Sequence, residues 1–263
     1  MRILFVGDIV GKPGRRALEG LLKKVIVEHG IEFTIVNGEN SAGGIGITPE
    51  TAMEILSQEV DVITSGNHIW AKKEIIPLLN DEKRLLRPAN YPAQVPGRGG
   101  GVFETNDGTK VGVLNLEGRV FMKNLDCPFR VGEREVEILK QETHVIIVDF
   151  HAEATSEKVA LGRFLNGKVS AVLGTHTHVQ TSDERILNGG TAYITDAGMT
   201  GPLASVIGVR EKIALERFLT QIPWKFDVAT GEIELQGVVM EISSETGKAT
   251  KIERIRVPLN ERS

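Results

Sequence analysis

Five short hydrophobic runs, each followed closely by polar residues, constrain this chain most strongly. The runs are rich in β-branched residues and alternate with stretches of helical spacing, which predicts parallel strands in an α/β fold. Ligands of open α/β sheets gather beyond the carboxyl ends of the strands, so we expect the polar residues to meet at one edge. The pairs are Ile3–Val6 with Asp8, Phe33–Val36 with Glu39 and Asn40, Val60–Thr64 with Asn67 and His68, Val145–Phe150 with His151, and Ala171–Leu173 with His176 and His178.

The polar set combines two carboxylates, two carboxamides and up to four imidazoles without a thiol. This mixture suits a hydrolytic site with two divalent metal ions. The string Gly174-Thr175-His176-Thr177-His178 is the strongest single indication. On an extended segment, imidazoles two residues apart point the same way, so they could bind one ion together or one ion each. Glu153 could orient an imidazole from outside the ligand set, or it could simply be exposed.

Taken singly, several of these residues have ordinary structural roles. An aspartate such as Asp8, between a strand and a glycine turn, is commonly a turn or helix cap. His151 follows a buried strand and could be a core histidine without a ligand. The repeated placement at strand ends, rather than any one residue, therefore carries the metal-site prediction.

Bulk properties limit the class of protein. The chain has 263 residues, 41% hydrophobic and 25% charged, with no repeat or long linker, so we predict a single domain over residues 1–263. Its net charge of −4 argues against a general nucleic-acid coat and leaves room only for a local binding groove. No apolar run is long enough to span a membrane, and the chain starts directly with a strand pattern. Cys127 is the only cysteine, which excludes an internal disulfide, so we expect a cytoplasmic protein.

The remaining patterns predict two packed mixed sheets with helices outside. Asn106-Asp107-Gly108 is typical of a hairpin turn between Val102–Thr105 and Lys110–Leu116. Alternating apolar and polar residues from about Glu232 predict antiparallel strands that cover one sheet edge. Glu117–Phe129 is expected to be a loop or an insertion. Expected helices are Pro13–His29, Thr48–Glu59, Lys73–Leu79, Val131–Gln141 and Ser156–Leu165.

The order of the polar motifs resembles that of the calcineurin-like metallophosphoesterase superfamily. The strings GDIVGKPGR, NGENSAGGIGIT, SGNHIW and GTHTHVQT, together with the later ITDAGMTGP, resemble its bacterial YmdB family along essentially the whole chain. Two positions depart from the usual superfamily pattern. Val10 stands where a histidine is common, and Glu39 stands where an aspartate is common. The YmdB branch shares both departures.

The resemblance implies a four-layer α/β/β/α sandwich and hydrolysis of phosphodiesters, with 2′,3′-cyclic nucleotides as substrates. It also implies two metal ions, iron or manganese, and cytoplasmic homo-oligomers. Matched by position, the first ion would be bound by Asp8, Glu39 and His178, with Glu39 as the bridge. The second ion would be completed by Asn40, Asn67, His151 and His176. His68 would be the proton donor.

Two other functions remain open at this point. The same metals could serve a phosphomonoesterase, or the chain could be a regulatory RNA- or protein-binding module with a vestigial metal site. The complete ligand set and His68 favour a hydrolase over a binding module. The sequence leaves open whether Glu117–Phe129 and Asp196–Gly208 cap the cleft or join subunits.

Overall fold

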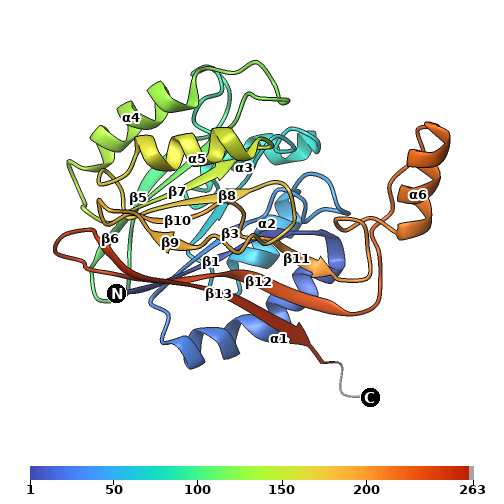
Figure 1. Ribbon diagram of the computed structural model, residues 1–263, viewed down its shortest axis with the longest axis horizontal. Helices are drawn as coiled ribbons and strands as arrows, with labels where there is room; N and C mark the ends of the chain where they lie inside the picture. The colour runs from blue at the N-terminus through green and yellow to red at the C-terminus, as the bar shows by residue number, and fades with distance from the viewer. Residues whose placement is uncertain (261–263) are drawn as a thin grey trace.

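Two mixed β-sheets pack face to face in the computed structural model, which describes residues 1–260 (Figure 1). The first sheet contains β2 (Asp8–Ile9), β11 (Met199–Pro202), β12 (Ile233–Ile242), β1 (Arg2–Val6), β3 (Phe33–Asn37) and β4 (Val62–Thr64), with β13 (Ala249–Leu259) paired to β12. The second contains β5 (Gly100–Glu104), β6 (Lys110–Glu117), β7 (Ile146–His151), β8 (Ala171–Thr175), β10 (Ala192–Ile194) and β9 (Arg185–Ile186).

Helices cover the outer face of each sheet, so the predicted four-layer α/β/β/α sandwich is confirmed. On the first sheet lie α1 (Gly11–His29), α2 (Pro49–Leu56), the 3₁₀ turn η1 (Lys73–Ile75) and α3 (Ile76–Asp81). On the second lie α4 (Pro128–Leu139) and α5 (Thr155–Phe164), which run along the top of Figure 1. None of the described helices has the length and apolar character needed to cross a membrane.

The alternation of side chains along the strands builds three apolar layers. In β1, Ile3 and Phe5 face the second sheet, whereas Leu4 and Val6 face the helices of the first. In β7, Ile147 lies between the sheets, while Ile146 and Val148 pack toward α4 and α5. Both faces of the parallel strands are therefore apolar, which explains their near-continuous hydrophobic runs. At residue 149 the inner face of β7 becomes polar, and this change marks the edge where the site lies.

The two antiparallel predictions are confirmed. β5 and β6 form the expected hairpin, with Phe103 opposite Val111. The carboxyl-terminal strands β12 and β13 pair with each other and extend the β1 edge of the first sheet. The predicted helix that begins at Thr48 has this residue as its N-cap, accepting a hydrogen bond from Thr51 N at 3.2 Å. This helix ends at Leu56, earlier than predicted, and Glu59 takes a left-handed conformation with φ 57° that a helix cannot continue through.

Several elements were not predicted. The strands β2, β9, β10 and β11 have two to four residues each, too few for periodicity to show. Helix α6 (Glu211–Thr220) was also missed, and it projects from the body of the molecule (Figure 1). Of its residues only Ala214 is buried, while Phe218 is 72% and Leu219 84% exposed.

Candidate metal centre

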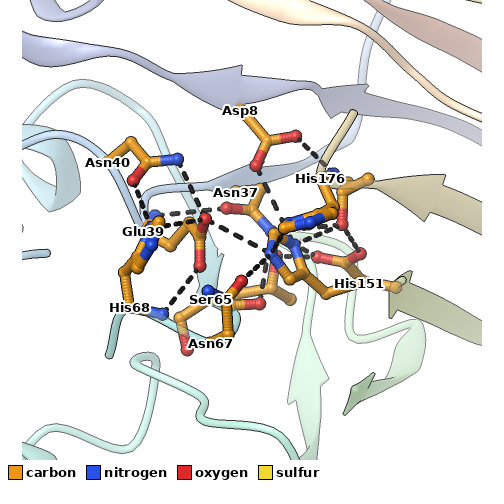
Figure 2. Close-up of polar contacts among 12 residues, drawn as sticks. Asp8, Asn37, Glu39, Asn40, Ser65, Asn67, His68, His151 and His176 are labelled. Atoms are coloured by element: carbon orange, nitrogen blue, oxygen red, sulfur yellow. Dashed lines mark hydrogen bonds and ion pairs between the residues drawn. The ribbon is translucent and has the colours of Figure 1, made fainter. Parts of the chain in front are cut away.

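The strand ends converge as predicted, and all eight predicted site residues lie at one edge of the two sheets. Asp8 comes from β2 and Glu39 and Asn40 follow β3, while Asn67 and His68 follow β4. The second sheet contributes His151 at the end of β7 and the two histidines after β8. Figure 2 shows the side chains from both sheets directed toward one another.

His151 stands at the centre of the tightest cluster. Its ring is fully buried, and its Nε2 atom lies 3.2 Å from Glu39 Oε1, 3.0 Å from Asn67 Oδ1 and 3.0 Å from His176 Nδ1 (Figure 2). One nitrogen with a single hydrogen or lone pair cannot satisfy three partners. Atoms that each lie about 2.1 Å from a shared ion are separated by roughly 3.0–3.4 Å, so this spacing fits a metal site. One ligand atom each from Glu39, His151 and His176 lies within 4.8 Å of the others.

Asp8 supplies a second, independent sign of a cation. Its Oδ2 accepts a hydrogen bond from His176 N at 3.1 Å, but its buried Oδ1 has no hydrogen-bond partner in the described part of the chain. That oxygen lies 3.9 Å from His178 Nε2. A buried carboxylate oxygen without a donor is costly, whereas a bound cation would satisfy it. The donor set at both positions therefore fits metal binding.

His68 lies at the exposed side of the cluster, with one third of its side chain accessible. Its Nδ1 lies 2.9 Å from Asn40 Oδ1 and 3.3 Å from Glu39 Oε1. The amide nitrogen of Asn40 donates to Glu39 Oε1 at 2.9 Å and lies 3.2 Å from His178 Nε2. Because Nδ1 is engaged by Asn40, the Nε2 atom is the one left for a reacting molecule.

The two histidines after β8 do not lie on an extended segment, which corrects the sequence prediction. β8 ends at Thr175, and His176 and His178 have positive φ angles of 101° and 64°. Such conformations are rare for non-glycine residues and persist only when the surroundings hold them. The two rings nevertheless reach the site at different places, His176 beside His151 and His178 beside Asn40.

Asp196 is a buried residue, not predicted from the sequence, that holds this histidine loop. Its Oδ2 accepts hydrogen bonds from Thr177 N at 3.0 Å and Thr177 Oγ1 at 2.7 Å, and it forms an ion pair with Lys158 Nζ at 2.8 Å. Its Oδ1 accepts from Gly198 N at 2.9 Å. The sequence marks Asp196 only through the family resemblance of its string and as the start of the segment Asp196–Gly208. Its partner Lys158, a buried lysine on α5, gives no signal in the sequence.

Two residues outside the proposed ligand set, Glu153 and Gly66, contact the rings of His176 and His151. Glu153 Oε2 lies 3.0 Å from His176 Nε2, so this carboxylate can orient the imidazole. The Glu153 side chain is also half exposed to solvent. Gly66 permits close packing on His151, since an added Cβ would lie 2.2 Å from Cδ2 of that ring. The sequence shows the glycine but not which ring it meets.

The charges of the site interact strongly because Asp8, Glu39 and His151 are fully buried. Burial is the largest influence on Asp8 and raises the pKa of its carboxyl, while His178 and His151 oppose the shift. Burial also raises the pKa of Glu39, but the charge and hydrogen bonds of His151 and His68 outweigh it and hold the pKa well below its usual range. Burial lowers the pKa of His151, yet the carboxylates, Glu39 foremost, raise it to about 9. Buried carboxylates here attract positive charge, as metal ligands do.

Comparison with known proteins agrees with this geometry. The family model described as YmdB-like protein matches residues 4–255. This chain belongs to that family. It is 48% identical over 257 residues to the 2′,3′-cyclic-nucleotide 2′-phosphodiesterase of Bacillus subtilis, with 98% of this chain and 97% of the relative covered.

Two solved structures share the fold of this chain. One is described as a hypothetical protein from Thermus thermophilus, with TM-score 0.91 and 40% identity over 98% of this chain and 99% of that one. The other is described as a novel phosphatase from Mycoplasma pneumoniae, with TM-score 0.91 and 35% identity over 98% and 93% of the two chains.

Proposed function

We propose that this chain is a metal-dependent phosphodiesterase that hydrolyses small phosphodiesters such as 2′,3′-cyclic nucleotides. The observation that carries the proposal is the meeting of Glu39, His151 and His176 within 4.8 Å, beside the unpartnered buried oxygen of Asp8. The B. subtilis relative, which is named for this activity, aligns with nearly the whole chain. Metal chemistry at this site is therefore directed at a phosphate ester.

The proposed ligands divide between two ions. Asp8, Glu39 and His178 would hold the first, Glu39 would be shared between the two, and Asn40, Asn67, His151 and His176 would complete the second. The position of His178 beside Asp8 and of His176 beside His151 supports this division. Imidazole ligands suit iron, and carboxylate and amide oxygens suit manganese, so we propose one of these metals.

When bound, the ions would supply two effects: a lower pKa for water and neutralisation of charge on the phosphate oxygens. A water molecule releases one proton to the solvent, its hydroxyl group bonds to phosphorus, and the bond between phosphorus and a ribose oxygen breaks. His68 transfers a proton from Nε2 to this departing oxygen, while Asn40 Oδ1 holds the opposite ring nitrogen at 2.9 Å. Proton donation of this kind typically accelerates a reaction about 10²–10⁴-fold.

A phosphate-ester panel tests the proposal. Protein loaded with manganese or iron is offered 2′,3′-cyclic AMP and a simple phosphomonoester in parallel, and we expect the cyclic diester to be hydrolysed with the higher kcat/KM. The Mycoplasma pneumoniae relative is described as a phosphatase, so a monoesterase is the second candidate. A preference for the monoester would select it, and metal-loaded protein that hydrolyses neither ester would favour the binding-module alternative.

We further propose that the enzyme acts in the cytoplasm as a homo-oligomer. Cys127, a free cysteine, is compatible with a reducing compartment. Self-association is supported by α6 and the chain after it, where large apolar side chains are exposed without cover from the described residues, including Phe218, Leu219 and Trp224. Light scattering should give a particle larger than one chain, and Leu219→Glu should reduce that size. A monomer in wild-type protein would contradict this part.

A further inference from the structure

The carboxylate of Asp149 lies beneath the metal centre and accepts hydrogen bonds from residues of both sheets. Its Oδ2 accepts from Asn37 Nδ2 at 2.9 Å and from Thr64 Oγ1 at 2.5 Å. Its Oδ1 accepts from Thr175 Oγ1 at 2.7 Å. Asn37 and Thr64 end strands of the first sheet, whereas Asp149 and Thr175 belong to the second. Asp149 is fully buried, so this network has no competition from water.

The Thr175 hydroxyl links this carboxylate to His151. It lies 2.9 Å from His151 Nδ1, on the side of the ring that faces away from the cluster around Nε2. A hydroxyl has a single hydrogen, and here it is donated to Asp149. Thr175 can therefore only accept from His151, which places a hydrogen on Nδ1.

Because His151 Nδ1 donates to Thr175, the other ring nitrogen, Nε2, is free to act as a metal ligand. With the hydrogen on Nδ1, the lone pair on Nε2 of a neutral ring would be available to a cation shared with Glu39, Asn67 and His176, whose facing atoms lie 3.0–3.2 Å from Nε2. Hydrogen bonds to the far nitrogen of a metal-bound histidine fix its tautomer and orientation and raise its basicity. We propose that Thr175 and Asp149 are positioning residues that fix the His151 ring with Nδ1 as donor and Nε2 directed at the metal pair. This inference rests on the proposed function.

Substitution of Thr175 tests the link. Thr175→Val keeps the shape of the side chain and removes the acceptor, whereas Thr175→Ser keeps the hydroxyl. Thr191→Val is the matched control, because Thr191 is equally buried and lies at the opposite end of the same sheet. Its hydroxyl donates to Val169 O at 2.7 Å and accepts from Gly167 N at 2.9 Å. Binding of Mn²⁺ alone is measured by calorimetry, and thermal unfolding is recorded for each variant.

We expect Thr175→Val to weaken one of two Mn²⁺ sites by about 10–100-fold, the range found when outer partners of metal ligands are removed. Thr175→Ser should restore affinity, and Thr191→Val should lose thermal stability without losing affinity. Unchanged affinity in Thr175→Val, or an equal loss in Thr191→Val, would overturn the inference while leaving the proposed function intact. Wild-type protein that binds no metal would overturn both.

A second measurement needs no variant and applies even if Thr175→Val fails to fold. Wild-type protein labelled with ¹⁵N at histidine is loaded with Zn²⁺ as a diamagnetic ion, and NMR correlations report which nitrogen of each ring carries hydrogen. We expect His151 to carry it on Nδ1. A hydrogen on Nε2, or a metal-bound Nδ1, would overturn the inference.

Discussion

The buried ion pair between Lys158 and Asp196 gives the sharpest stability prediction. The two side chains are 1% and 0% exposed, and the pair joins α5 to the segment after β10. Asp196 also accepts hydrogen bonds from Thr177, which lies in the loop that carries the site histidines. Lys158→Met keeps most of the buried stem and removes the ammonium. Removing one member of a buried pair typically costs about 3–5 kcal/mol, because the other charge stays buried without its partner.

Substitution of Lys158 and substitution of Asp196 should lower the free energy of unfolding by different amounts. After Lys158→Met, Asp196 still accepts three hydrogen bonds from Thr177 and Gly198, so we expect a loss near 3 kcal/mol, the low end of the ~3–5 kcal/mol range. After Asp196→Asn, Lys158 loses the one carboxylate that it pairs with among the described residues, and the new amide hydrogens face existing donors, so we expect a loss near 5 kcal/mol, the high end of the ~3–5 kcal/mol range. At roughly 2–4 °C per kcal/mol, Tm should fall by about 6–12 °C and 10–20 °C respectively.

Differential scanning calorimetry and urea unfolding measure these losses. Lys110→Met is the matched control, because the 3.4 Å pair of Lys110 with Glu142 is exposed on both sides and such pairs contribute about 0–1 kcal/mol. Equal effects of Lys158→Met and Lys110→Met would refute the reasoning, as would a smaller loss for Asp196→Asn than for Lys158→Met.

Three further predictions concern the site. His68→Ala should keep the metal content and lower kcat for cyclic nucleotide about 10²–10⁴-fold, and an unchanged rate would remove His68 from the mechanism. Glu39→Gln should lower the metal content, whereas two full equivalents by elemental analysis would refute its bridging role. Gly66→Ala should displace the His151 ring, since the new Cβ would lie 2.2 Å from it, and thus lower both metal content and Tm. Metal content and Tm that both stay at wild-type values would contradict this prediction, because the neighbouring backbone would then have shifted without loss of stability.

Much of the site was predictable because each strand end is marked in the sequence by a short apolar run followed by polar residues. Asp8, Asn67 and His151 each follow an apolar run, and parallel pairing brings such positions to one edge. The layers were predictable for the same reason, since the apolar runs, the hairpin turn and the helical spacings are all local patterns.

Contacts between distant segments were not predictable. Asp149 was read as part of an apolar strand, yet it hydrogen-bonds to Asn37, 112 residues away in the sequence. The positive φ of His178 depends on Asp196 and the loop around Ile207, whose carbonyl oxygen lies 2.9 Å from His178 Nδ1. Such features arise only when the tertiary structure overrides local preference.

The most direct test of the central claim is a metal titration of hydrolysis. Protein stripped by chelator under anaerobic conditions is given Mn²⁺ in steps, and the rate of 2′,3′-cyclic AMP hydrolysis is measured against bound metal. We predict no hydrolysis by stripped protein and a rise that is complete at two ions per chain. Full activity without metal, or no activity with both ions bound, would contradict the account.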